Sequence, residues 1–138
     1  MAEDYKKHFE EGVGKISQED VFRAASSGSE LFNVIQKSSL LAKQIKKLKL
    51  LWNMLKDFVD DRYKDVPWFT IASIAFVLLY VINPVDLIPD FIPLAGFADD
   101  VSVLFIAWNL VGEDLRKYCK WKATQDREFK EIYDELFA

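Results

Sequence analysis

The sequence has few of the residues that most enzyme and metal sites require. Its 138 residues include a single histidine, His8, and a single cysteine, Cys119. One histidine cannot build a histidine-based triad or zinc site, and one cysteine excludes an intrachain disulfide and a cysteine zinc site. The five glycines form no glycine-rich phosphate-binding loop. No base is evident beside any serine, so the sequence gives no support for an enzyme.

A strong excess of charge of one sign is also lacking. The chain has 18 lysines and arginines against 22 aspartates and glutamates, which gives a net charge of -4. Nonspecific binding of nucleic acid needs a dense basic face, so we expect no nucleic-acid partner. The opening residues MAEDYKKHFEEGVGK lack the apolar core of a secretion signal. We therefore expect a cytoplasmic protein.

Segments with a strand pattern are missing as well, because the β-branched residues fall at helical spacing or beside prolines. The sequence predicts an all-α fold, a small helical bundle around a central apolar helical hairpin. We expect one domain overall, with an N-terminal arm and short helices in 1–39, a central helical domain in 40–124 and an amphipathic helix in 125–138. Residues 1–16 should form a loose or marginally helical arm, and Ser17 with Asp20 resembles a capping box at the start of the next helix.

An amphipathic helix is predicted for residues 40–62. Its apolar seam comprises Leu41, Ile45, Leu48, Trp52, Leu55 and Val59, and Lys43, Lys46, Lys47 and Lys49 lie between these positions. Lysines in such a pattern are more often a solvated helix face, and the alternative is contact with an anionic membrane surface or an acidic partner. The seam could also pair with a second copy, so a homo-oligomer through this helix is a further hypothesis.

The longest apolar run, residues 68–82, is too short to span a bilayer. Fifteen helical residues at roughly 1.5 Å each cover about 22 Å, whereas the hydrocarbon core is roughly 30 Å thick. A second apolar run, 101–112, is shorter, and extending it would place Asp99 and Asp100 in hydrocarbon. These lengths favour a buried antiparallel hairpin, 67–82 and 99–118, over two transmembrane helices.

Between these two apolar runs, residues 80–101 read YVINPVDLIPDFIPLAGFADDV. Proline fixes its own φ and biases the preceding residue away from the helical region. Because three prolines interrupt this segment, a helix should end near Asn83 and another should begin near Asp99. The residues of this proposed structural motif are Tyr80, Asn83, Pro84, Asp86, Pro89, Asp90, Pro93, Gly96, Asp99 and Asp100.

Four aspartates in this segment are candidate ligands for a divalent cation: Asp86, Asp90, Asp99 and Asp100. Carboxylate oxygens suit Mg²⁺, Ca²⁺ or Mn²⁺, although this spacing matches no established metal loop. Helix and turn capping explains the same residues, with Asp99 as an N-cap, Asp100 in the first helical turn, and the other two at proline turns. We favour capping and expect no cofactor, with a divalent cation as the alternative.

The run NPVDLIPDFIP followed by GFADD resembles the signature of the YkvA-like family, a bacterial domain of unknown function. The resemblance is specific at this motif and extends more loosely from about residue 40 to about residue 121. It implies a small bacterial protein associated with membranes, and the same domain is also attached to other modules, including a membrane-bound ubiquitin ligase. The family has no established activity to transfer.

From these observations we expect a noncatalytic adaptor or scaffold of unknown process. Such a protein would meet a protein partner or the inner membrane surface, peripherally or partly inserted, through apolar surface that its own helices leave uncovered. The alternative is a divalent-metal-dependent activity that uses the aspartates of residues 80–101.

Overall fold

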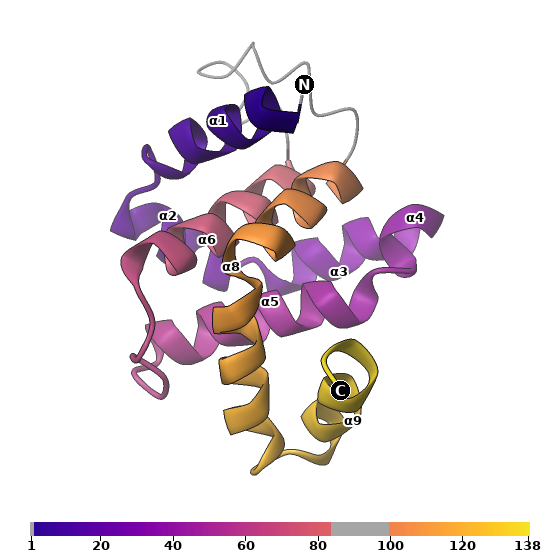
Figure 1. Cartoon of the computed structure of the whole chain (residues 1–138). Coiled ribbons are helices and arrows are strands. Elements are labelled where there is room, and N and C mark those ends of the chain that lie inside the picture. Colours follow the sequence, from indigo (N-terminus) through magenta and orange to yellow (C-terminus); the bar gives the residue numbers. More distant parts are fainter. Residues whose placement is uncertain (1, 84–99) are drawn as a thin grey trace.

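The computed structural model describes residues 2–83 and 100–138, and within these ranges the regular structure is helical throughout. The predicted all-α class is therefore confirmed (Figure 1). The helices are α1 (Ala2–Val13), α2 (Gln18–Ala25), α3 (Gly28–Lys37), α4 (Ser39–Ala42), α5 (Ile45–Val59), α6 (Trp68–Ile82), α8 (Asp100–Ala123) and α9 (Arg127–Leu136).

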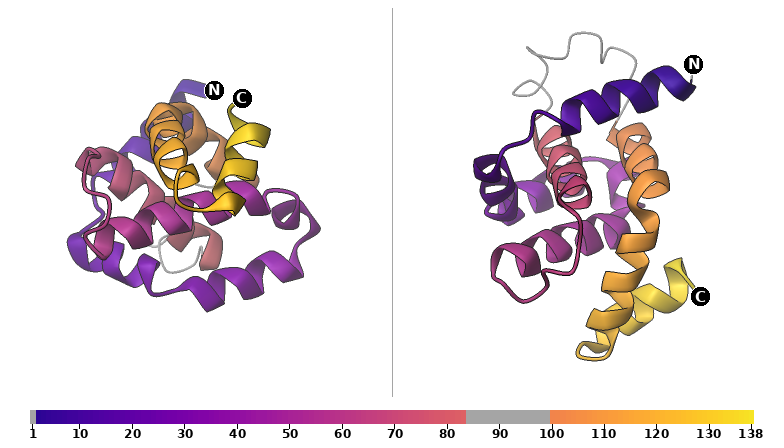
Figure 2. Two further views of the ribbon diagram at one scale, coloured as in Figure 1. Left: turned by 90° about the horizontal axis from the view of Figure 1, so that it is seen from below. Right: turned by 60° about the vertical axis from the view of Figure 1, so that its left-hand side comes forward.

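Helix α6 occupies the centre of the bundle. Every residue from Thr70 to Val81 is buried, and α1, α2, α3, α5 and α8 all contact this helix. It lies antiparallel beside α8 (Figures 1 and 2), and the Thr70 hydroxyl donates a hydrogen bond of 2.5 Å to Asp114 across the pair. The prediction of a buried helix that ends near Asn83 is thus confirmed. Among the described residues, none of the helices combines the length and apolar character needed to cross a bilayer.

Helix α1 belongs to the hydrophobic core, so residues 1–16 contain the helix that was one of the two expectations, and the expectation of a loose arm is wrong. Phe9 is fully buried, and its ring meets Phe76 of α6 edge to face, with the centroids 5.3 Å apart. Val13 and Ile16 are buried beside it. The buried residues of this segment form a short apolar stripe among many charged residues, so the stripe is not evident in the sequence. Packing on α6 stabilises a helix that its own sequence favours only weakly.

Alanine substitution should have opposite effects on stability at two glycines, Gly12 and Gly112. A Cβ at Gly12 would lie 2.5 Å from Cε1 of Phe76, whereas a Cβ at Gly112, inside α8, would have no atom within 4 Å. Gly112→Ala should raise the free energy of unfolding by about 0.5–1 kcal/mol, because alanine has the higher helix propensity. Gly12→Ala should lower it by about 1–3 kcal/mol through overpacking. Urea unfolding of both variants measures the difference, and equal effects would contradict the packing of α1 on α6.

The predicted helix over 40–62 is interrupted, which corrects its boundaries. Helices α4 and α5 are separated at Lys43 and Gln44, and α5 ends at Val59. Asp61 then adopts a left-handed backbone conformation with φ of 63°, a common way to terminate a helix. The seam is also largely filled from within the chain, because Leu41, Leu48 and Leu55 are buried. Self-association through this helix stays a prediction.

The C-terminal part of the chain follows the prediction in type and departs from it in length. Helix α8 continues past the expected end at residue 118 to Ala123, and Tyr118 is fully buried. The predicted amphipathic helix near the C-terminus is present as α9, which packs against α8 (Figure 2). Ion pairs Lys46–Glu135 and Lys49–Glu128 also connect α9 to α5. The capping box predicted at Ser17 and Asp20 is confirmed.

Candidate functional site

The residues of the predicted motif are described only in part. Tyr80 is buried in α6, Asn83 follows its last turn, and Asp100 is the first residue of α8. The other residues of the motif lie outside the described ranges: Pro84, Asp86, Pro89, Asp90, Pro93, Gly96 and Asp99. Within the described residues, no group of three or more histidine, cysteine, aspartate or glutamate side chains could hold a metal ion. The divalent-cation hypothesis for the aspartates therefore stays a prediction.

A buried polar cluster forms around Asp57, near the end of α5. Its side chain is almost fully buried, and it accepts hydrogen bonds from the Tyr118 hydroxyl at 2.6 Å and the Lys122 ammonium at 2.9 Å. Arg62 approaches the same carboxylate at 3.6 Å. The Asp57 carbonyl accepts bonds from the backbone N–H groups of Arg62 and Tyr63. The cluster thus joins α5, the loop after it and the C-terminal half of α8.

The groups of this cluster have the properties of structural residues and lack those of catalytic ones. Burial and the hydrogen bond to Asp57 raise the pKa of Tyr118, so the phenol stays protonated. Burial also raises the pKa of the neighbouring Cys119 thiol to about 11, which keeps it protonated and unreactive at neutral pH. A protonated phenol and thiol with no access to solvent lack the exposure that nucleophilic catalysis requires. We therefore interpret the groups around Asp57 as a structural connection between α5 and α8.

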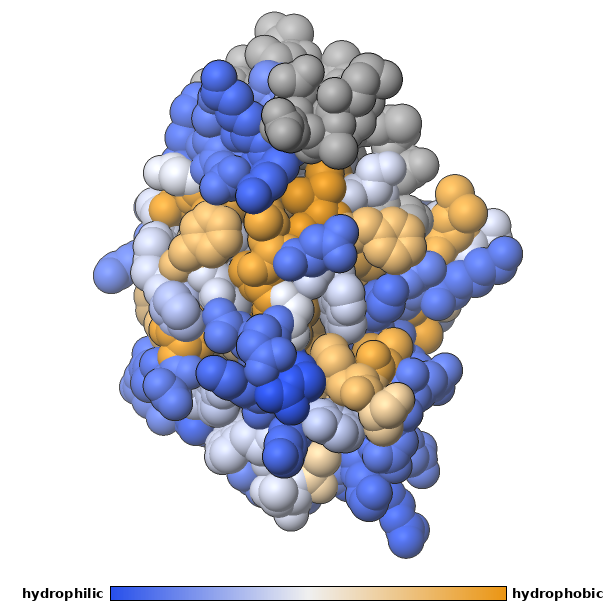
Figure 3. All heavy atoms as spheres, viewed as in Figure 1, coloured by the Kyte–Doolittle hydropathy of each residue, from blue (hydrophilic) through white to orange (hydrophobic). Residues whose placement is uncertain are grey.

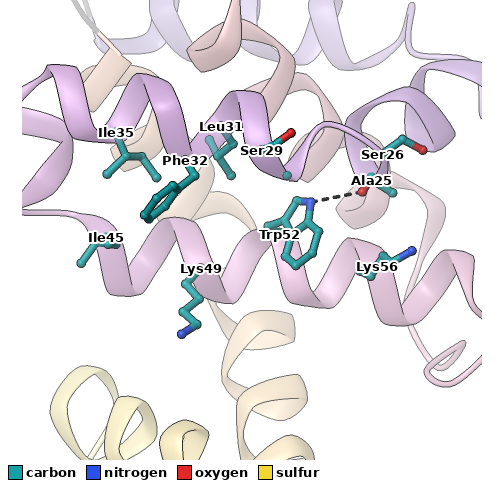
Figure 4. A pocket seen from close by; sticks show the side chains of 11 residues that line it. Ala25, Ser26, Ser29, Leu31, Phe32, Ile35, Ile45, Lys49, Trp52 and Lys56 are labelled. Atoms are coloured by element: carbon teal, nitrogen blue, oxygen red, sulfur yellow. Dashed lines mark hydrogen bonds between the residues drawn. The ribbon is translucent and has the colours of Figure 1, made fainter.

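An apolar groove lies between α3 and α5, which run antiparallel side by side (Figure 4). Its volume is about 520 Å³, within the usual range for small-molecule sites of roughly 300–1,000 Å³. Trp52 lies in the middle of the groove, where its indole N–H donates to the Ala25 carbonyl at 3.2 Å. The lining residues are Ala25, Ser26, Gly28, Ser29, Leu31, Phe32, Ile35, Ile45, Lys49, Trp52 and Lys56.

The two ends of this groove differ in polarity. Ser26, Ser29 and Lys56 lie near one end, whereas Phe32, Ile35 and Ile45 lie near the other (Figure 4). Lys49 is engaged by Glu128 of α9, and Lys56 has a longer contact of 3.6 Å with Asp60. An elongated ligand with one anionic end would match this distribution.

Residues 31–56 form a basic segment that contains six lysines and no acidic residue. Lys46 and Lys49 are paired with α9, and Lys47 lies over the rings of Phe105 and Trp108 at 4.8 and 5.0 Å. Lys37 and Lys43 are exposed, and neither is in an ion pair among the described residues. These two lysines flank Leu40 in sequence, at the end of α3 where the chain turns through α4 into α5.

The same stretch of the chain also carries three large exposed apolar side chains. Phe32, Leu40 and Ile45 are exposed by 52%, 56% and 41%. Exposed lysines beside exposed apolar groups are typical of surfaces that contact anionic bilayers. We call Phe32, Lys37, Leu40, Lys43 and Ile45 the basic corner.

Other exposed apolar residues are spread over α2, α6 and α8, namely Phe22, Trp68, Phe69 and Phe105. Figure 3 shows apolar side chains reaching the surface along α8, with hydrophilic side chains on both sides. Lys47 covers part of that surface through its contacts with Phe105 and Trp108. The basic corner differs from these positions because it combines apolar exposure with two lysines that form no ion pair within residues 2–83 and 100–138.

Comparisons with known proteins give a family and a relative. Residues 70–106 match the family described as "Protein of unknown function (DUF1232)". The chain is similar to the "Uncharacterized membrane protein YkvA" of Bacillus subtilis (strain 168), with 34% identity over 80 residues. The aligned part covers 58% of this chain and 76% of that protein. No solved structure matches the chain.

Proposed function

For this chain, which belongs to the YkvA-like family of proteins of unknown function, we propose the role of a noncatalytic adaptor. It would bind peripherally to the anionic surface of the inner membrane through its basic corner. The name of the Bacillus relative supports a membrane location. The observation that carries the proposal is that one stretch of the chain, residues 32–45, holds three exposed apolar side chains together with Lys37 and Lys43, which are exposed and form no ion pair with any residue that the structure describes.

Electrostatics and apolar burial would act together at this corner. Each lysine near an anionic bilayer contributes about 1 kcal/mol at most. An apolar side chain that moves from water into the acyl boundary adds roughly 25 cal/mol per Å² of buried area. The whole chain carries a net charge of -4, so the other faces would be repelled and the molecule would bind in one orientation.

Replacing both free lysines tests the charge component. Lys37→Gln with Lys43→Gln should weaken binding to vesicles that contain an anionic lipid by roughly tenfold, because two favourable surface charges are lost. Flotation of the purified protein with neutral vesicles and with anionic vesicles measures this. Wild-type protein should bind anionic vesicles more tightly than neutral ones by a similar factor, and its binding to anionic vesicles should fall as salt is added.

The matched control is Lys6→Gln with Lys7→Gln. Both lysines are exposed on α1, so this pair removes the same charge from another helix and should leave vesicle binding nearly unchanged. Equal losses from the two pairs would show that net charge, and not the basic corner, governs binding. Failure of the wild-type protein to float with anionic vesicles would refute the proposed function.

A further inference from the structure

The geometry points to a second property of the same region: we propose that the groove between α3 and α5 binds one long-chain fatty-acid anion, with the carboxylate beside Lys56 and the tail beside Phe32, Ile35 and Ile45. The inference rests on the proposed function, because a membrane surface would supply this ligand.

The lining of the groove favours an acyl chain. Leu31, Phe32, Ile35, Ile45 and Trp52 provide an elongated apolar surface between two antiparallel helices (Figure 4). A partner helix, roughly 10 Å across, would have to enter where the Trp52–Ala25 hydrogen bond already ties α5 to the end of α2. A flexible single chain can occupy the groove without breaking that bond.

Charge at the polar end supplies the complementarity for a carboxylate. Lys56 is the last lysine of the basic segment, and its 3.6 Å contact with Asp60 is a surface i,i+4 pair, which is a weak interaction. Ser26 and Ser29 lie toward the same end, but their hydroxyls point away from the groove, so Lys56 is the group that would meet the carboxylate (Figure 4). Lys49 points toward α9, where it pairs with Glu128.

The apolar end of the groove is continuous with the basic corner. Phe32 and Ile45 belong both to the groove lining and to the exposed residues of that corner. A chain leaving the bilayer would therefore meet apolar surface at every step. This continuity distinguishes the α3–α5 groove from the cavity beside α2, whose lining includes Gln18, Asp61 and Lys64.

The test uses dodecanoate as a monomer in vesicle-free buffer. Calorimetric titration should give one dodecanoate bound per chain, and octanoate should bind far more weakly, because each buried methylene adds about fourfold to affinity. Lys56→Gln should weaken dodecanoate binding by about tenfold, the size of a charge-assisted hydrogen bond. Ile45→Asn should also weaken it, because it places an amide at the tail end.

Two matched variants serve as controls for Lys56→Gln and Ile45→Asn. Lys130 on α9 forms the same kind of i,i+4 pair, with Asp134, so Lys130→Gln should leave binding unchanged. Phe22→Asn removes another exposed apolar residue outside the groove and should also be neutral. Equal affinity for octanoate and dodecanoate, or equal effects of Lys56→Gln and Lys130→Gln, would overturn the inference.

Vesicle flotation separates the inference from the proposed function. Wild-type protein that floats with anionic vesicles and binds no dodecanoate refutes the groove ligand alone. Protein that binds dodecanoate through the groove and does not float refutes the proposed membrane contact.

Discussion

Replacing Asp57 with alanine is expected to lower the free energy of unfolding by about 3–5 kcal/mol, the usual cost of removing one partner from a buried ion pair. The Lys122 ammonium is largely buried beside Asp57, and the Tyr118 hydroxyl is fully buried. Alanine would leave the Lys122 charge without its carboxylate partner and the Tyr118 hydroxyl without its acceptor. Urea unfolding followed by circular dichroism measures the change.

Three further variants test whether the loss of stability comes from the contacts of Asp57 with Lys122 and Tyr118. Asp60→Ala removes an exposed acid three residues after Asp57, directly after the end of α5. It should change the free energy of unfolding by less than 1 kcal/mol. Tyr118→Phe should cost less, about 1.5–3 kcal/mol, because it removes one hydrogen bond to the Asp57 carboxylate and leaves the Lys122 ammonium in place. Combining Asp57→Leu with Lys122→Met should recover most of the stability that Asp57→Ala loses. A loss below 1 kcal/mol in Asp57→Ala would show that the cluster does not lock α5 to α8.

Local patterns in the sequence were sufficient for most of the helices. The run 68–82 is apolar on every side, so burial and the stop at Asn83 followed from composition and from Pro84. Ser17 and Asp20 specify their capping box with side chains only three residues apart. For residues 1–16 the sequence indicated at most a marginal helix, because the packing of α1 depends on the contact of Phe9 with Phe76, which are distant in sequence.

The candidate sites depend on such distant contacts, which a single sequence does not display. Asp57 and Lys122 are separated by 65 residues, and in the sequence Asp57 looks like one more acid at a helix end. The groove forms because the chain turns at α4, so that α5 runs back along α3. Phe32 and Ile45 lie at apolar positions of the predicted helices, yet this arrangement leaves both side chains exposed. One signal was present in the sequence: residues 31–56 contain lysines and no acid.

Removing the apolar side chains of the basic corner is expected to have the largest effect on vesicle binding. The variant with Phe32→Ser, Leu40→Ser and Ile45→Ser should bind anionic vesicles roughly two orders of magnitude more weakly than wild type. Each of the three side chains is about half exposed in the free protein, so transfer of the exposed part to the bilayer contributes about 1 kcal/mol per residue. Flotation over a series of lipid concentrations gives the affinity, and a thermal melt checks that the variant is folded.

The surface of the protein offers a closely matched control for this variant. Phe22, Phe69 and Phe105 have comparable exposure, at 55%, 39% and 45%, and they lie on α2, α6 and α8. Changing all three to serine removes a similar apolar area away from the free lysines Lys37 and Lys43, so vesicle binding should change little. Added salt should weaken the residual binding of the corner variant by about the same factor as that of wild type, because both proteins keep the same lysines. If the control triple loses more affinity than the corner triple, the membrane contact lies on the other side of the bundle, and the free lysines of the basic corner are only a solvated face.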